Sequence, residues 1–280
     1  VASIEPSGYA TMVYDREGNL TETLVKSGAN RLEATYEELP QCLIDAFVAI
    51  EDSRFWSHKG IDIRSILRAA VGVITGESAG GGSTLTQQLI KNNIFEGGNE
   101  NTFGEKLERK IQEQYLAVQL EKIMDKKIIL KNYLNTINLG NNTLGVKAAA
   151  LRYFNKDVSD LTLSEATVIA GITQAPTRYN PLTENGRKNN EEKRRVILQY
   201  MYEQGLIDKE AQEEALADDV YSRITNVNLT AQEGHGSAAG GTGLYGNPGL
   251  KPPVLRRPGN PHHPGPEDAG DRGRRGQQSG

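Results

Sequence analysis

Acidic residues follow an apolar helical stretch in the segment AFVAIEDSRFWSHKGID (residues 46–62), the densest polar cluster in an otherwise apolar context. Glu51 and Asp52 would stand at the rim of a core, where a carboxyl that is partly removed from water can exchange a proton near neutral pH. The simpler alternative is a helix C-terminus whose acids form a salt-bridge network with Arg54 and Lys59. The residues alone leave both interpretations open.

A glycine run followed by hydroxyl and amide side chains forms a second cluster, GGGSTLTQQLIKNN (residues 80–93). Glycine permits close backbone approach, and a helix N-terminus favours anions, so the segment is typical of a site for phosphate or sugar oxygens. No G-K-[ST] follows the glycines, which disfavours a nucleotide-binding loop. The alternative is an ordinary loop in which Ser83 or Thr84 caps a helix.

A third cluster, EKLERKIQEQYLAVQLEK (residues 105–122), places Arg109 and Glu113 one helical turn apart, with Lys110 beside them. Such pairs commonly stabilise a solvated helix. If this face turned inward, it would offer a second carboxylate beside two cations, which suits a reaction with an anionic leaving group.

The elements that carry these clusters are mostly helical. Alternation on both sides of DREGN predicts a short β-hairpin over residues 9–25, with Gly18 in its turn. Helical periodicity and caps then predict helices near 40–50, 63–70, 84–91, 107–120, 128–134, 164–171, 187–204 and 208–217. The predicted fold class is mainly α.

Composition separates the chain into an apolar-rich part and a tail. Residues 231–280 contain 13 Gly and 7 Pro and only a handful of large apolar side chains. Burial of so few apolar side chains cannot offset the conformational entropy that ordering this segment would cost. We therefore predict an N-terminal hairpin or linker (1–28), one domain (29–225) and a low-complexity tail (226–280) that is disordered or out of frame. A net charge of −4 disfavours a nucleic-acid partner, and the single cysteine, Cys42, excludes an internal disulfide.

Five segments together resemble the motifs of the family 51 glycosyltransferases, the peptidoglycan glycosyltransferase domain of class A penicillin-binding proteins and monofunctional transglycosylases. They occur in the family's order between about residues 30 and 205: EDSRFWSHKG (51–60), GGSTLTQQLIKN (81–92), RKIQE (109–113), KKIILKNYLN (126–135) and RYNP (178–181). Two positions depart from the family's pattern. Lys131 stands where the fourth motif usually has Glu, and Asn138 stands where the family commonly has a Tyr nearby.

The resemblance implies a reaction and a set of residues. The 4-hydroxyl of an acceptor sugar would attack the anomeric carbon of lipid II, giving β-1,4-linked glycan strands with inversion and release of undecaprenyl diphosphate. Glu51 matches the general base and Glu113 the second catalytic carboxylate. The expected substrate-binding residues are Asp52, Phe55, Ser83, Thr84, Thr86, Gln87, Gln88, Lys91, Arg109, Lys110 and Asn135.

The implied fold is a lysozyme-like α lobe with a smaller membrane-facing jaw, which the segment IRSILRAAVGVITG (63–76) matches in position. The alternative for this segment is a plain core helix. Expected partners are lipid II, the growing glycan, the membrane surface and cell-wall synthesis proteins. The expected location is the outer face of the bacterial cytoplasmic membrane, with the anchor outside this chain. No cofactor is required for certain. A divalent cation (Mg²⁺ or Mn²⁺) that contacts Asp52 is an open option, and no metal ligand is assigned.

Two other functions stay open on the residues alone. One is a lysozyme-like enzyme that cleaves glycan with a single Glu, which would not need the basic cluster beside Glu113. The other is an inactive glycosyltransferase fold that binds cell-wall partners. No S-x-x-K or K-T-G occurs after residue 205, so we expect no peptide cross-linking or covalent β-lactam binding by this sequence.

Overall fold

The computed structural model describes residues 11–14, 20–24, 30–76, 81–95, 102–227 and 229, all within one compact unit, Val1–Gly236. The predicted turn at Gly18 lies outside the described residues, as does the predicted tail apart from residues 226, 227 and 229.

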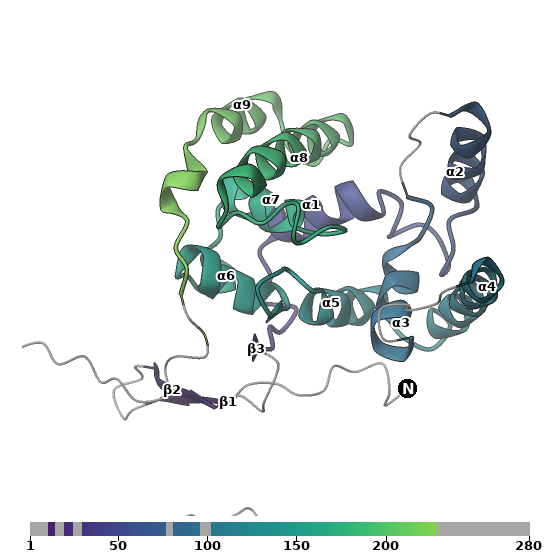
Figure 1. Ribbon diagram of the computed structural model, residues 1–280, viewed down its shortest axis with the longest axis horizontal. Helices are drawn as coiled ribbons and strands as arrows, with labels where there is room; N and C mark the ends of the chain where they lie inside the picture. Colours follow the sequence, from purple (N-terminus) through teal and green to yellow (C-terminus); the bar gives the residue numbers. More distant parts are fainter. Residues whose placement is uncertain are drawn as a thin grey trace, which may run out of the picture. The chain divides into compact units, whose positions relative to one another are not determined.

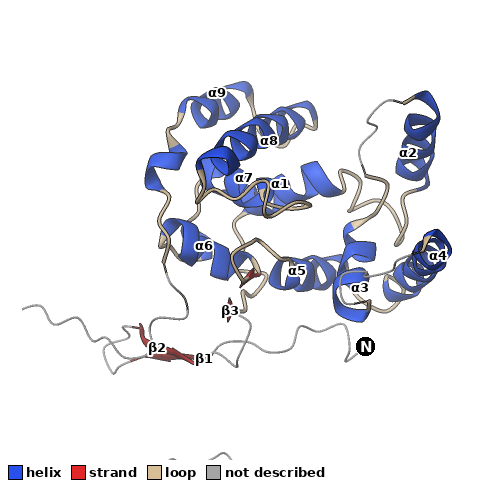
Figure 2. Ribbon diagram, viewed as in Figure 1, coloured by secondary structure: helices blue, strands red, loops and turns tan. Residues whose placement is uncertain are grey.

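Helices dominate the described residues (Figures 1 and 2), which confirms the mainly α prediction. They are α1 (Gln41–Glu51), α2 (Ile63–Thr75), α3 (Leu85–Ile94), α4 (Phe103–Leu120), α5 (Lys126–Thr136), α6 (Val146–Phe154), α7 (Leu163–Gly171), α8 (Glu184–Glu203) and α9 (Lys209–Ala217), with 3₁₀ turns η1 (Val158–Asp160) and η2 (Val220–Arg223). The strands are β1 (Thr11–Tyr14), β2 (Leu20–Leu24), β3 (Asn30–Arg31) and β4 (Thr143–Leu144).

Side-chain caps fix where most of these helices begin. Thr84, Thr102 and Thr162 each form a reciprocal capping box with the residue three positions later, at the starts of α3, α4 and α7. Asp62 and Asp125 cap α2 and α5. A cap of this kind stabilises a helix by about 1 kcal/mol, so the short helices around the candidate site start at defined residues.

The core is centred on α1 and α7, both largely buried. α1 packs against α7 and α8, while α3 packs against α4 and α5. Residues Leu43, Ile44, Phe47 and Val48 of α1 are buried in this core. Because α1 is held on several sides, the residue at its C-terminal end, Glu51, has a fixed position.

Short strand pairs complete the fold. β1 and β2 pair antiparallel, with an irregularity between Val13 and Tyr14, which confirms the predicted hairpin. β3 pairs parallel with β4, a contact that the sequence did not predict. Helix α6 was also not predicted; its N-cap is Gly145, which has no capping side chain.

Candidate active site

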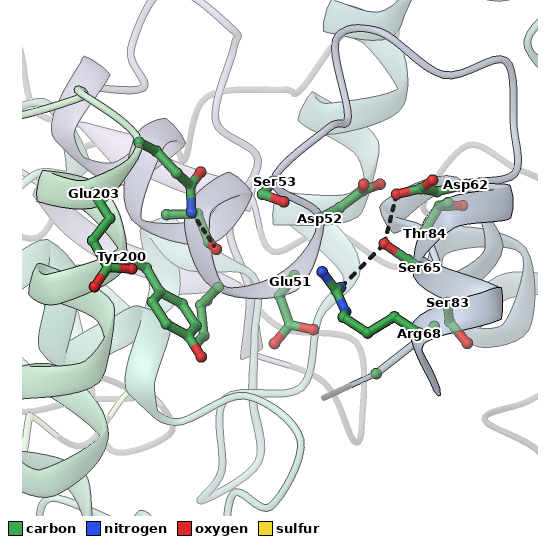
Figure 3. Close-up of a pocket in the computed structure, with 15 residues that line it drawn as sticks. Glu51, Asp52, Ser53, Asp62, Ser65, Arg68, Ser83, Thr84, Tyr200 and Glu203 are labelled. Carbon is green, nitrogen blue, oxygen red and sulfur yellow. Dashed lines mark hydrogen bonds between the residues drawn. The ribbon is translucent and has the colours of Figure 1, made fainter. Parts of the chain in front are cut away.

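Glu51 lies at the end of α1 on the wall of a cavity of about 450 Å³ (Figure 3). Asp52 ends the helix, with extended φ of −160°. In Figure 3 the Arg68 side chain extends from α2 toward Glu51. The cavity is lined by Ala49, Ile50, Glu51, Asp52, Ser53, Asp62, Ser65, Arg68, Gly81, Gly82, Ser83, Thr84, Tyr200, Glu203 and Gln204. The first and second predicted clusters therefore meet at one cavity, together with α8.

Neutral donors from two distant segments hold the Glu51 carboxylate. Gln88 of α3 donates from Nε2 to Oε2 at 2.9 Å. Thr173 Oγ1 lies 2.6 Å from Oε1, and Gln174 Nε2 lies 3.1 and 3.2 Å from the two oxygens. Tyr133 donates to Gln88 Oε1 at 3.3 Å and so turns the amide nitrogen of Gln88 toward Glu51. The alternative network of Glu51 with Arg54 is absent here, because Arg54 Nε binds Asp62 Oδ2 at 2.9 Å.

Asp52 joins the end of α1 to the start of α3. Its Oδ2 accepts the backbone N–H of Leu85 at 3.0 Å and lies 2.8 Å from His58 Nε2. The Asp52 side chain is almost fully buried. Since Glu51 and Gln88 sit on these two helices, Asp52 fixes the spacing at which Gln88 reaches Glu51.

A buried polar chain supports Asp52 from behind. Gly60 N–H donates to His58 Nδ1 at 3.2 Å, which leaves Nε2 to carry the proton toward Asp52. Lys126 Nζ lies 3.2 Å from the same Nδ1 and 2.8 Å from Glu121. Burial lowers the pKa of Lys126, and the Glu121 carboxylate opposes that shift. This support was not predicted from the sequence, although His58 belongs to the first cluster.

Most predicted residues of the second cluster build the start of α3. Thr84 donates its hydroxyl to Gly60 O at 2.7 Å and, with Gln87, forms the capping box. Thr86 is fully buried and donates to Glu121 Oε1 at 2.5 Å. Ser83 lines the cavity and accepts from Lys110 Nζ at 3.0 Å. Ser83 is therefore the link between the cavity and α4.

The predicted cations of α4 surround Glu113. This carboxylate is fully buried, pairs with Arg109 through Nη1, and lies 2.7 Å from Lys110 Nζ. Lys110 keeps 40% of its side chain exposed and Arg109 11%. This helix face turns inward, which is the orientation that would put a carboxylate beside two cations. Both cations pair with the one carboxylate of Glu113.

Of the eleven predicted substrate-binding residues, only Asp52, Ser83 and Thr84 line the cavity, and the other eight include Asn135, Phe55 and Lys91. Asn135 is fully buried and exchanges both its amide hydrogen bonds, 2.9 and 2.8 Å, with the backbone of Ala34. Phe55 is fully buried beneath Lys126, whose Nζ lies 4.4 Å from the ring centroid. Lys91 sits in the last turn of α3 and is half-buried. The contacts of Asn135 and Phe55 are those of residues that support the fold.

In the ranges that the structure describes, no group of three or more His, Cys, Asp or Glu side chains could hold a metal. Asp52, the contact that the sequence left open, already uses Oδ2 for Leu85 and His58.

The sequence profile of the family described as Transglycosylase matches residues 17–202, well over half of the chain. The chain belongs to the transglycosylase family. Penicillin-binding protein 1A of Clostridium perfringens (strain 13 / Type A) is 42% identical over 224 residues, covering 77% of this chain and 32% of the relative. Penicillin-binding protein 1A of Aquifex aeolicus is 43% identical over 208 residues, 74% of this chain and 27% of the relative.

This transglycosylase chain spans about a quarter to a third of the length of these curated relatives. A crystal structure of penicillin-binding protein 1A from Haemophilus influenzae is also similar, with 24% identity and a TM-score of 0.43, covering 80% of this chain and 22% of that chain.

Sequence reasoning missed several residues of this transglycosylase site. Thr173 and Gln174 contact Glu51 from 122 and 123 residues further along the chain. Arg68, Tyr200 and Glu203 line the cavity. The fifth motif, RYNP (178–181), begins four residues after Gln174, but nothing in the sequence around it indicates that the Gln174 side chain turns toward Glu51.

Proposed function

We propose that this chain is a peptidoglycan glycosyltransferase that polymerises lipid II into β-1,4-linked glycan and releases undecaprenyl diphosphate, with residues 29–225 as the working domain. The supporting observation is the Glu51 carboxylate, held on the cavity wall by Gln88, Thr173 and Gln174. Neutral donors orient a carboxylate without supplying a counter-charge, so it keeps its capacity to accept a proton. Membership of the transglycosylase family supports the same reaction class.

Glu51 acts as the general base in this proposal. The acceptor 4-hydroxyl oxygen bonds to the donor's anomeric carbon, its proton passes to Glu51, and the bond from that carbon to the diphosphate oxygen breaks. The electron pair leaves with the diphosphate, and attack from the opposite face inverts the anomeric centre. The carboxylate must lie within hydrogen-bond reach of the hydroxyl, which its position on the cavity wall permits.

Cations would balance the leaving group. A diphosphate is already a competent anion, so it needs charge neutralisation more than a proton. Lys110 reaches the cavity wall through Ser83, and Arg109 shares its carboxylate partner. Because Glu113 is fully buried, we propose that it acts by holding these two cations in place.

The membrane surface is the proposed partner of α2. Within the described ranges, no helix combines the length and apolar character that a membrane crossing needs. Ile63, Leu67 and Val71 are nevertheless 63%, 61% and 57% exposed, at a spacing of four residues that puts them on one helix face. An exposed stripe of this kind beside arginines suits an interfacial helix, which would place the cavity at a membrane surface. The surface that we propose is the outer face of the cytoplasmic membrane.

Polymerisation of labelled lipid II in detergent tests the proposal. Wild type should give long, lysozyme-sensitive polymer and Glu51→Gln none. Glu192→Gln, which alters an exposed carboxylate on α8, is the matched control and should polymerise like wild type. Cleavage of preformed glycan by the wild type, or equal polymerisation by Glu51→Gln, would contradict the proposal.

A further inference from the structure

Gln174 reaches Glu51 from a strained backbone position. Its φ is +67°, in the left-handed region that residues with a Cβ rarely adopt. Its Nε2 lies 3.1 Å from Oε1 and 3.2 Å from Oε2 of Glu51. Strain of this kind persists when the surroundings require it, and it gathers at functional sites. The conformation thus directs one amide onto one carboxylate.

Gln174 differs in exposure from the other two side chains that contact Glu51. Thr173 is buried, with 1% of its surface exposed. Gln88 is half-buried and its amide oxygen is tied to the buried Tyr133. Gln174 is exposed to solvent. An incoming molecule can therefore displace the Gln174 amide while Thr173 and Gln88 keep their hydrogen bonds to Glu51.

We propose that Gln174 is a positioning residue that holds Glu51 in the resting site and is displaced from it by the hydroxyl of the acceptor sugar. The inference rests on the proposed function, in which Glu51 is the base. The amide N–H lies within hydrogen-bond distance of both carboxylate oxygens and fixes the plane of the carboxylate. When the acceptor hydroxyl takes the place of the amide, it meets a carboxylate that is already oriented.

Three substitutions at this position separate the amide from the backbone strain. Gln174→Ala removes the amide and keeps a Cβ at positive φ, whereas Gln174→Gly removes the amide and the strain together. Gln174→Glu keeps the length but opposes Glu51 with a second carboxylate. Asn142→Ala is the matched control, because Asn142 is exposed and has φ of +57°.

The decisive measurement is kcat and the acceptor KM for polymerisation by the full chain. We expect Gln174→Ala and Gln174→Gly to raise the acceptor KM about tenfold at nearly unchanged kcat, because the amide orients Glu51 only until the acceptor binds. Gln174→Glu should raise the acceptor KM further, because a second carboxylate faces Glu51, and Asn142→Ala should leave both constants unchanged. The charged and titratable groups of the surrounding elements stay the same in all four variants: Asp52, Asp62, Arg68, Tyr133, Tyr200 and Glu203.

An acceptor KM that stays at the wild-type value in Gln174→Ala, or a lowered kcat at unchanged KM, overturns the inference. Thermal unfolding should place Gln174→Gly above Gln174→Ala, and the reverse order would contradict the strain argument. If wild type forms no polymer, the proposed function fails first. A double-mutant cycle of Glu51→Gln and Gln174→Ala in urea unfolding then decides the contact: coupling supports it, and additivity overturns it.

Discussion

Replacing Glu113 with glutamine should destabilise the fold although it removes only one charge. Glu113 is fully buried and is the shared partner of Arg109 and Lys110. Glutamine keeps the shape and one acceptor oxygen, but it removes the negative charge that Arg109 and Lys110 share. Removing one member of a buried charge group exposes the desolvation cost of the members that stay.

The two cations contribute unequally to the expected loss. A hydrogen bond to a charged group contributes about 1.5–3 kcal/mol. Arg109 is 11% exposed, so its bond counts nearly in full, whereas Lys110 is 40% exposed and can turn to water. We discount the Lys110 bond to well under half and expect a loss of about 2–3 kcal/mol in the free energy of unfolding.

Urea unfolding at neutral pH, followed by far-ultraviolet circular dichroism, measures this loss. Glu108→Gln is the control, because Glu108 is exposed on the same helix and should change stability by less than about 0.5 kcal/mol. A double change, Arg109→Met with Glu113→Leu, should lose less than Glu113→Gln alone, since no buried cation is left unpaired. Equal stability of Glu113→Gln and Glu108→Gln would refute the argument.

Three other predictions concern pH, backbone and membrane. Arg223 lowers the pKa of Asp218 to about 2, so this ion pair stabilises the fold at pH values above the pKa of Asp218 in the unfolded chain, near 4. The stabilisation is lost as the pH falls toward 2. In acid unfolding, the difference in stability between wild type and Arg223→Gln should therefore close between about pH 4 and pH 2. Gly60→Ala should cost more than about 2 kcal/mol in urea unfolding, because a Cβ would meet backbone at 2.5 Å, whereas Gly76→Ala, with positive φ but open space, should cost about 1 kcal/mol. Serine at the three exposed apolar positions of α2 should weaken sedimentation with anionic vesicles without lowering thermal stability: Ile63, Leu67 and Val71.

Local signals explain which elements the sequence predicts. The α3 start is readable because Thr84 and Gln87 form a capping box within four residues. Helix α6 was not predicted because its N-cap residue, Gly145, has no side chain that could cap the helix. The parallel pairing of β3 with β4 joins two-residue strands more than a hundred residues apart, and such short strands carry no periodicity.

The candidate site was predictable to the extent that its residues lie within the motifs. Glu51, Gln88, Ser83 and Lys110 are brought together as the resemblance implied. The role of Gln174 was not predictable. Glutamine seldom adopts a positive φ, and its partner Glu51 is 123 residues away. Long-range contacts of this kind depend on the packed fold.

The periodicity of α4 predicted a helix correctly but not which face is buried. Its inward residues include Glu113 and Ala117. The apolar residues at spacing four are exposed instead: Phe103, Leu107, Ile111 and Tyr115. Periodicity shows that an apolar face exists without showing what covers it. Helix α2 carries a second exposed apolar stripe. Arg68 of α2 lines the cavity, and Lys110 of α4 donates to Ser83 on the cavity wall. The proposed substrate is a lipid-linked sugar, so the apolar surface that would cover both stripes comes from outside the chain.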